Sequence, residues 1–402
     1  MQEIKRLAII STHPVQYYAP LFRLLHERAK ISIKVYYTWG EASLTKHDPG
    51  FNKIVEWDLP LLKGYPYEWC QNNSNDPGSH HFKGIKTPVL QQQIAAYNPD
   101  AIFIFGWAYH SHLSLIRHFS GKIPLCFRGD STLLDETGIF KSLFRKIYLT
   151  WVYKHIDHAF YTGSRNKEYF KNYGLEEEQL TFTPHAIDNE RFAEDRQQEA
   201  KLLREELGAK ERDILILFAG KLEAKKDPEI LLKAFLELKR SDVHLLFVGN
   251  GCLEKKLKDT VNELTTTVLK SGDRVHFMDF QNQKKMPSIY QGCDLFCLPS
   301  KGPGESWGLA VNEAMACGKA ILVSDKVGAA ADLVRSAENG QTFIAGNLTD
   351  LKKRLKELTF SRSQLKSLGK KSNTIINDWN FNKIVEAIED RICSLDERYD
   401  VN

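Results

Sequence analysis

Short, uninterrupted apolar runs, separated by stretches with helical periodicity, constrain the fold of this chain more than any other feature. A strand with one face in solvent alternates between apolar and polar residues, whereas these runs do not alternate. They therefore predict parallel strands covered by helices on both faces, an α/β arrangement in both halves of the chain. The runs cover residues 6–11, 31–37, 101–105, 123–127 and 158–161, and then 214–219, 244–248, 275–278, 295–299 and 320–323.

The length of the chain predicts two domains. Its 402 residues exceed the roughly 250–300 residues over which a single hydrophobic core keeps growing. The charged stretch 190–212 separates the two sets of apolar runs, so we place the boundary near residue 195. The expected segments are an N-terminal domain over 1–195, a C-terminal domain over 196–375, and a final helix within 376–402 that packs back toward the N-terminal domain.

Composition and charge exclude several classes of protein. Hydrophobic residues make up 42% and charged residues 26% of the chain, as in ordinary globular proteins, and a net charge of +4 does not indicate a nucleic-acid-binding face. No run approaches the ~18 apolar residues that span a bilayer. The seven scattered cysteines suit a reducing compartment, and Cys293 and Cys297 are predicted to be buried thiols rather than zinc ligands. We therefore expect a cytoplasmic protein with no nucleic-acid partner and leave its oligomeric state open.

Two loops after strands of the second half carry groups suited to phosphate. Ligands of open parallel sheets bind outside the carboxyl ends of the strands. The turn after run 214–219 carries three lysines, among them Lys221 and Lys226, just before a helix, and cations and helix-start amides both bind phosphates. The next such loop has Gly249 and Gly251, which let the main chain approach a ligand. A solvated lysine turn and a plain strand-to-helix turn are the respective alternatives.

A third loop carries two carboxylates eight residues apart, Glu305 and Glu313. Helical spacing across 308–317, followed by Gly318, predicts a helix with Glu305 in the loop at its start and Glu313 inside it. Both oxygens of a carboxylate accept hydrogen bonds from hydroxyls, so a glutamate at such a site suits a sugar or a ribose. Since Glu313 stands among apolar residues, its charge is expected to be paired or functional.

These elements together resemble the family 4 retaining glycosyltransferases, in the family's order and spacing. The resemblance implies the GT-B fold, with two Rossmann-like, doubly wound parallel-sheet domains facing a cleft. It also implies a nucleotide diphosphate sugar as donor, bound by the C-terminal domain, and transfer with retention of anomeric configuration. The elements are Gly220-Lys-Leu with Lys226, the Val-Gly-x-Gly turn at 248–251, Pro299-Ser300, the E-x7-E pair with Trp307-Gly308-Leu309 and Glu313-Ala-Met-Ala-Cys-Gly318, and Val327-Gly328 followed by Asn339-Gly340.

The resemblance also implies roles for individual residues. Lys226 corresponds to the lysine on the donor diphosphate, and Lys221 stands where an arginine is commoner, which keeps the charge but loses the bidentate fork. Glu313 corresponds to the ligand of the nucleotide ribose, and Glu305 to the carboxylate that faces the transferred sugar. The other expected donor-binding residues are Gly249, Gly251, Trp307, Gly308 and Leu309, the last three through helix-start amides.

Loops of the first half supply the candidates for acceptor binding and chemistry. His13 and Gln16 lie in His13-Pro-Val-Gln16-Tyr-Tyr, which resembles a branch of surface-polysaccharide transferases and replaces the glycine-rich loop common in the family. A capping or core histidine is the alternative for His13. Related enzymes carry a histidine or an aspartate near the reacting sugar carbon at the position of Asp130. Asp130 therefore completes the expected catalytic set with Lys226 and Glu305.

Three further features of the first half keep an alternative open. Arg128 precedes Asp130 and is expected in the cleft, although the pair could also form a salt-bridged turn in which Asp130 caps a helix. Trp107 offers an aromatic face to an acceptor, and ordinary packing explains it equally well. The basic, aromatic stretch 140–146 suggests a peripheral contact with the inner face of the membrane, against which stands an amphipathic core helix.

The expected chemistry needs neither metal nor cofactor. No D-x-D motif occurs in the chain, and lysines with helix termini would neutralise the leaving diphosphate. The predicted function is therefore transfer of a sugar, of hexosyl type, to a glycan, lipid-linked or small-molecule acceptor. A nucleotide-sugar epimerase or hydrolase of the same fold, and a non-catalytic donor-binding subunit, are the alternatives.

Overall fold

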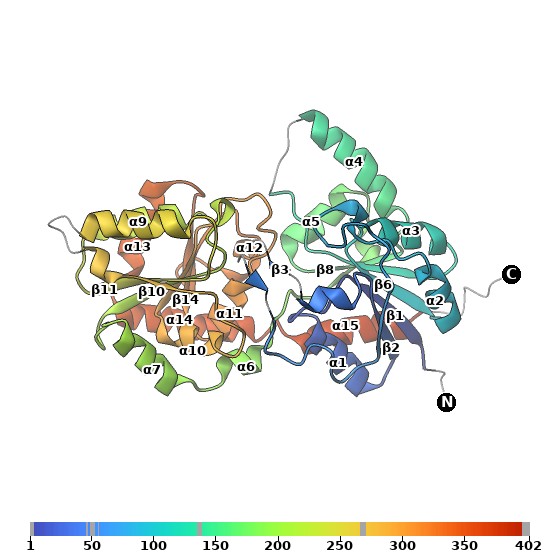
Figure 1. Ribbon diagram of the computed structural model, residues 1–402, viewed down its shortest axis with the longest axis horizontal. Coiled ribbons are helices and arrows are strands. Elements are labelled where there is room, and N and C mark those ends of the chain that lie inside the picture. Colours follow the sequence, from blue (N-terminus) through green and yellow to red (C-terminus); the bar gives the residue numbers. More distant parts are fainter. Residues whose placement is uncertain are drawn as a thin grey trace. The chain divides into compact units, whose positions relative to one another are not determined.

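The chain divides into two compact α/β units (Figure 1). The first unit comprises Met1–Lys46, Leu59–His185 and Phe381–Asn402, and the second comprises His47–Asp58 and Ala186–Asn380. The computed structural model describes residues 4–45, 47–48, 53–54, 56–134, 139–265 and 271–395.

The first unit is built on a seven-stranded parallel sheet in the order β5-β2-β1-β6-β7-β8-β9. Its inner strands are buried almost throughout because helices cover the sheet. The strands are β1 (Arg6–Ser11), β2 (Ser32–Tyr37), β5 (Tyr67–Trp69), β6 (Ala101–Phe105), β7 (Leu125–Arg128), β8 (His158–Tyr161) and β9 (Leu180–Phe182). The helices are α1 (Ala19–Arg28), α2 (Leu90–Tyr97), α3 (His110–Phe119), α4 (Ile139–Tyr153), α5 (Ser164–Asn172) and α15 (Phe381–Cys393).

The second unit is built on a six-stranded parallel sheet in the order β12-β11-β10-β13-β14-β15. The strands are β10 (Ile214–Ala219), β11 (Val243–Val248), β12 (Val275–Met278), β13 (Leu295–Leu298), β14 (Ala320–Ser324) and β15 (Gly340–Phe343). The helices are α6 (Asn189–Ala193), α7 (Gln197–Glu206), α8 (Pro228–Leu238), α9 (Glu254–Thr265), α10 (Met286–Gly292), α11 (Ala310–Ala316), α12 (Ala330–Leu333), α13 (Leu348–Leu358) and α14 (Arg362–Ile376). An antiparallel pair, β3 (His47–Asp48) and β4 (Lys53–Ile54), also belongs to this unit.

The predicted fold class is confirmed, and every predicted apolar run forms a strand. Five paired strands of the described residues were missed: β3 and β4, which pair only with each other, and β5, β9 and β15, each of which lies at an edge of its parallel sheet. β3 and β4 are two residues long, and the three edge strands are three or four residues long and keep part of their surface in solvent, so none has an uninterrupted apolar run. The predicted helix over 308–317 is present as the shorter α11.

Helix α15 belongs to the first unit and packs against α1. Glu389 of α15 has only 1% of its side chain exposed, and its carboxylate accepts hydrogen bonds from Nε and Nη2 of Arg28 at 3.0 and 2.9 Å. Lys30 Nζ lies 3.3 Å from the same carboxylate. Since a buried carboxylate is tolerated only with such partners, this pairing fixes the final helix on α1. Among the described residues, no helix has the length and hydropathy needed to cross a bilayer.

Candidate functional site

Two predicted donor-binding residues meet at the carboxyl edge of the second sheet. Lys226 follows β10 and Glu305 follows β13, and these strands are neighbours. Lys226 Nζ lies 2.5 Å from Glu305 Oε2, which also accepts a hydrogen bond of 2.9 Å from Ser300 Oγ. Glu305 is 7% exposed, so the ion pair is largely shielded from water. The fold thus joins an ammonium and a carboxylate that lie 79 positions apart in the sequence.

The turn between Glu305 and α11 requires glycine at position 308. Gly308 has φ +92°, a conformation that side chains disfavour. A Cβ on it would also lie 3.0 Å from Val327 Cγ1 and 3.1 Å from Leu298 Cδ2. The glycine therefore permits the close packing that holds the Glu305 loop on the end of β13.

Glu313 is buried in α11, 4% exposed, and its Oε2 accepts a hydrogen bond of 2.8 Å from the hydroxyl of Tyr290 on α10. The indole of Trp307 is also buried and donates to Asn312 Oδ1 at 2.8 Å. Tyr290 was not among the predicted site residues. A tyrosine in an apolar stretch gives no sequence signal that its hydroxyl meets a carboxylate on another helix.

Gly249 and Gly251 have a packing reason independent of any ligand. A Cβ on Gly249 would lie 2.2 Å from the Gly220 carbonyl oxygen, and one on Gly251 would lie 2.4 Å from that of Leu222. The amide of Leu222 donates to the Asn250 carbonyl at 3.0 Å. The loops after β10 and β11 therefore lie directly against one another, while the role of the two glycines toward a donor stays a prediction.

The lysines of the turn after β10 have different surroundings. Lys226 pairs with Glu305, whereas Lys225 Nζ lies 3.4 Å from Glu223. Lys221 is partly buried. The structure therefore ties Lys226 to the predicted carboxylate.

An aromatic pair lies beside the loop after β12. The rings of Trp57 and Phe280 are 6.1 Å apart, edge to face. Asn282 Nδ2 donates to the Glu56 carbonyl at 2.6 Å, and Asn250 Nδ2 donates to Asp279 at 2.9 Å. Trp57 was missed because it lies in the first half of the chain, although it belongs to the second unit.

In the first unit, the loops that carry the predicted acceptor residues leave the same edge of the sheet. His13, Trp107 and Asp130 follow β1, β6 and β7, which are adjacent strands. Trp107 and Asp130 line one cavity of about 340 Å³, together with Tyr148 of α4. His13 lies edge-on to Trp39 at 5.4 Å, and Gln16 is partly buried in the same loop.

Arg128 is buried inside this unit rather than presented at its surface. It is 2% exposed, and its Nη1 and Nη2 donate to the carbonyls of Thr183 and Pro184, each at 3.0 Å. Burial lowers the pKa of the guanidinium to about 10, so it stays charged at neutral pH. Arg128 therefore ties the end of β7 to the segment that leads out of the first unit, and its predicted role toward an acceptor stays a prediction.

His185 stands close to the predicted catalytic aspartate. Its Nε2 lies 4.0 Å from Asp130 Oδ2, and Asp130 is 46% exposed. Burial lowers the pKa of His185 to about 4, while Asp130 opposes this shift. Burial and the Asp130 charge raise the pKa of Tyr18 to about 12. At neutral pH both groups are thus neutral hydrogen-bonding side chains beside a carboxylate.

The cysteines and one surface cluster bear on metal binding. Cys293 and Cys297 are buried, as predicted, and burial raises the pKa of the Cys293 thiol to about 12. In the described part of the chain, Asp76, His80 and His81 form a group that could hold a metal ion, with each histidine Nε2 3.2 Å from Asp76 Oδ2. The predicted donor and catalytic residues do not belong to this exposed group.

The donor-side elements lie in a segment that matches a family model. Residues 199–374, which include Lys226, Glu305 and Glu313, match the family described as Glycosyl transferases group 1. The D-inositol 3-phosphate glycosyltransferase of Nocardia farcinica is 27% identical over 215 residues, which cover 52% of this chain and 46% of that protein. The match with this relative therefore spans slightly less than half of its length.

Two solved structures share the fold over nearly the whole chain. HepE from Anabaena, in complex with UDP and glucose, superposes with a TM-score of 0.70 at 18% identity, covering 97% of this chain and 100% of that one. WaaG, a glycosyltransferase involved in lipopolysaccharide biosynthesis, has a TM-score of 0.67 at 16% identity and the same coverage. The fold is therefore the two-domain GT-B architecture that the sequence predicted.

Proposed function

We propose that this protein is a glycosyltransferase that takes a sugar from a nucleotide diphosphate sugar bound to its second unit. The observation that carries the proposal is the shielded Lys226–Glu305 pair at the carboxyl edge of the second sheet. It lies within the segment that matches a glycosyltransferase family. Lysine suits a diphosphate, and the carboxylate suits sugar hydroxyls.

Donor binding exchanges the partners of this pair. The diphosphate accepts hydrogen bonds from Lys226, and Glu305, released from the ammonium, accepts hydrogen bonds from the hydroxyls of the transferred sugar. Glu313, oriented by Tyr290, accepts them from the nucleotide ribose. Because Lys226 stands in a largely shielded position, its charge acts strongly on the charge that develops on the leaving diphosphate.

Transfer proceeds with retention of anomeric configuration and without a metal ion. The acceptor hydroxyl attacks the anomeric carbon on the face that the diphosphate leaves, and its proton passes to a leaving phosphate oxygen. Lys226 and the amides of Gly308 and Leu309 stabilise the diphosphate, in place of a metal. Asp130 acts near the reacting carbon, with His185 and Tyr18 as its neutral neighbours.

The first unit binds an acceptor that presents a sugar ring, as in a surface polysaccharide or a lipid-linked glycan. The support is the cavity of about 340 Å³, in which Trp107 and Tyr148 offer aromatic faces beside Asp130. Their rings are 5.6 Å apart. Aromatic faces bury apolar surface with specific geometry, and the carboxylate can accept hydrogen bonds from sugar hydroxyls.

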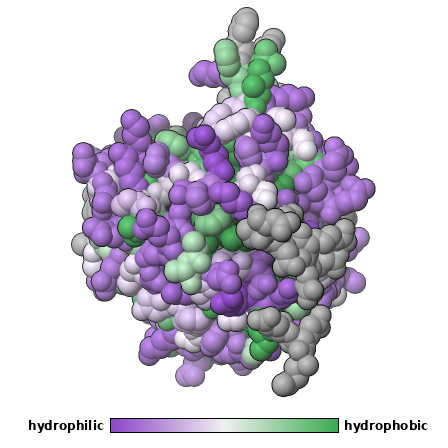
Figure 2. All heavy atoms as spheres, turned by 90° about the vertical axis from the view of Figure 1, so that its right-hand side faces the viewer, coloured by the Kyte–Doolittle hydropathy of each residue, from purple (hydrophilic) through white to green (hydrophobic). Residues whose placement is uncertain are grey.

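Helix α4 supports a contact with an anionic membrane surface at the cytoplasmic face. Leu143, Phe144 and Ile147 are 58%, 74% and 64% exposed, whereas Leu149 and Tyr153 of the same helix pack in the core, so only the later part of α4 is the core helix that the sequence left open. Lys141 and Lys146 are exposed on the same helix. Figure 2 shows apolar surface on the helix at the top of the view. Apolar side chains beside lysines are the composition of a helix that lies on anionic lipid.

A donor-hydrolysis and transfer assay with purified protein tests the proposed function. A panel of nucleotide sugars is incubated with and without glycan and lipid-linked acceptors. Lys226→Ala and Glu305→Ala should each lower transfer at least about tenfold, which corresponds to roughly 1.4 kcal/mol of lost transition-state stabilisation. The exposed Lys371 gives the matched control Lys371→Ala, which should leave the rate unchanged.

Three results would contradict the assignment. Near-native transfer in both variants would show that Lys226 and Glu305 take no part in the reaction. Isomerisation or complete hydrolysis of the donor without an acceptor would indicate an epimerase or hydrolase. Donor binding without turnover across all acceptors would indicate a non-catalytic subunit.

A further inference from the structure

A cavity of the second unit lies at the edge of the sheet opposite to the donor loops. It has a volume of about 1480 Å³. Gln291, Gly292, Gly318 and Lys319, which line it, precede the first residues of β13 and β14. In a parallel sheet all amino ends lie at one edge and all carboxyl ends at the other. This cavity is therefore separate from the site of Lys226 and Glu305.

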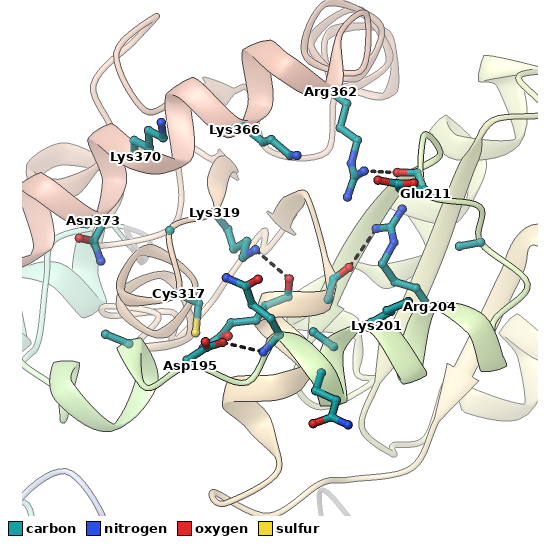
Figure 3. A pocket seen from close by; sticks show the side chains of 18 of the residues that line it. Asp195, Lys201, Arg204, Glu211, Cys317, Lys319, Arg362, Lys366, Lys370 and Asn373 are labelled. Carbon is teal, nitrogen blue, oxygen red and sulfur yellow. Dashed lines mark hydrogen bonds between the residues drawn. The ribbon is translucent and has the colours of Figure 1, made fainter.

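One wall of the cavity is a stripe of cations on α14. Arg362, Lys366 and Lys370 are four residues apart, so they share one face of the helix, and Asn373 extends it. Figure 3 shows the three basic side chains in sequence along the helix that borders the cavity. Like charges at this spacing repel one another. An anion against the stripe would remove that repulsion.

Lys319 adds an ammonium at the inner side of the same cavity. It is partly buried, and its Nζ donates one hydrogen bond of 2.9 Å to the Gln291 carbonyl (Figure 3). Burial lowers the pKa of this ammonium below its usual value. An ammonium carries three donors, and a single carbonyl uses one of them.

The cations of this cavity differ in whether a carboxylate already neutralises them. Asp294 accepts hydrogen bonds from Arg204 at 3.0 Å and from Arg362 at 2.8 Å. In contrast, no carboxylate of the described residues lies within ion-pair distance of Lys319, Lys366 or Lys370. Three ammonium groups around one cavity thus lack the anion that the neighbouring arginines have.

The remaining lining indicates what kind of anion fits. Among the described residues that line the cavity, none is aromatic, so it offers no platform on which a nucleotide base could stack. Three acidic residues, Asp195, Glu205 and Glu211, also line it and would repel an anion placed against them. The lysines therefore favour a compact ligand with several phosphate groups, held on the α14 side.

We propose that this cavity is a regulatory site for a compact, non-aromatic polyphosphate or multiply phosphorylated metabolite, bound by Lys319, Lys366 and Lys370. Two helices connect it with the donor site. Tyr290 lies in α10, which ends at Gly292 beside the cavity, and Glu313 lies in α11, which ends just before Cys317 and Gly318. Lys319 contacts the last turns of both helices, because its Nζ donates to the Gln291 carbonyl of α10 and its amide donates to the Ala314 carbonyl of α11 at 3.0 Å. An anion bound to Lys319 can therefore shift the ends of both helices. The regulatory part rests on the donor site proposed above.

Calorimetry with sodium tripolyphosphate tests the site on the full chain. The titration is carried out in the Lys226→Ala background, so that the donor phosphate site does not contribute. One saturable site is expected, and Lys319→Met and the double variant Lys366→Glu/Lys370→Glu should each weaken it at least about tenfold, about 1.4 kcal/mol. Lys366 and Lys370 are exposed, so the double variant keeps the fold. Lys371→Glu, an exposed lysine of α14 that does not line the cavity, should bind like the parent.

Several outcomes would overturn the proposal. Loss of binding in Lys226→Ala alone would locate tripolyphosphate at the donor site. If Lys371→Glu weakened tripolyphosphate binding as much as the cavity variants, or if sulfate bound equally well at matched ionic strength, the binding would be non-specific electrostatic attraction. Binding of ATP but not of tripolyphosphate would contradict the proposal that the ligand lacks an aromatic group. With Lys226 restored, an unchanged affinity for the nucleotide sugar at saturating tripolyphosphate would overturn the regulatory role.

Discussion

The carboxyl edges of the two sheets differ in the charge and the exposure of the side chains that they carry. At the second sheet, Lys226 and Glu305 neutralise one another in a shielded position before any ligand arrives. At the first sheet, Asp130 is 46% exposed and stands beside His185, whose pKa of about 4 leaves it uncharged at neutral pH. A preformed ion pair suits a charged diphosphate, whereas neutral aromatic and imidazole groups suit an uncharged sugar.

Acidification should destabilise the first unit more than the second, and this is the largest expected effect. His112, His158 and His185 of the first unit each have a pKa lowered by burial to about 4, whereas the second unit has His276 with a pKa of about 4 and His244, whose pKa burial also lowers. Below about pH 6.5 these histidines become protonated in the unfolded chain but stay neutral in the folded protein until the pH approaches 4. Stability is therefore complete above about pH 6.5 and is lost toward pH 4, by up to about 1.4 kcal/mol per pH unit for each histidine.

Urea unfolding between pH 7 and 4.5, with pulsed hydrogen exchange to follow peptides of each unit, measures this difference. His112→Gln should flatten the pH dependence of the first unit, and His110→Gln, at an exposed position, should not. Equal acid sensitivity of the two units would remove this part of the contrast.

Arg128→Met should destabilise the first unit by about 2–4 kcal/mol, because two buried carbonyls and the hydroxyl of Thr183 lose their donors. The free energy of unfolding from urea titration gives the value. Arg117→Met is the control at an exposed arginine of the same unit and should cost less than about 0.5 kcal/mol. If Arg128→Met lost little free energy of unfolding but strongly reduced transfer, Arg128 would instead act in the acceptor site.

Tyr290→Phe should have the smallest effect and should act on donor binding. It removes only the hydroxyl that donates to Glu313, about 1 kcal/mol or roughly a fivefold rise in the KM for the nucleotide sugar. A positioning role predicts that kcat changes little. Tyr97→Phe, which removes a hydroxyl bonded to the Ser32 carbonyl in the first unit, is the matched control. A fall in kcat with an unchanged KM would contradict the role given to Glu313.

Much of the site could be predicted because its signals are local. Lys226, Glu305 and Glu313 stand directly after apolar runs or within a helical pattern, and parallel strands bring such strand ends to one edge. The partners of these residues could not be predicted in the same way. Tyr290 and His185 lie far from Glu313 and Asp130 in the chain, and nothing in their local sequence reports the contact.

The sequence alone determined the α/β pattern of both units and the order of the donor-side motifs, since both depend on the spacing of residues along one strand, loop or helix. Only the tertiary structure decided which charges are neutralised. It paired Lys226 with Glu305, enclosed Arg128 among carbonyls, and left Lys319, Lys366 and Lys370 around one cavity with no carboxylate of the described residues within ion-pair distance. The physical reason is that the energy of a charge depends on burial and on neighbours brought from distant segments, neither of which is a property of local sequence.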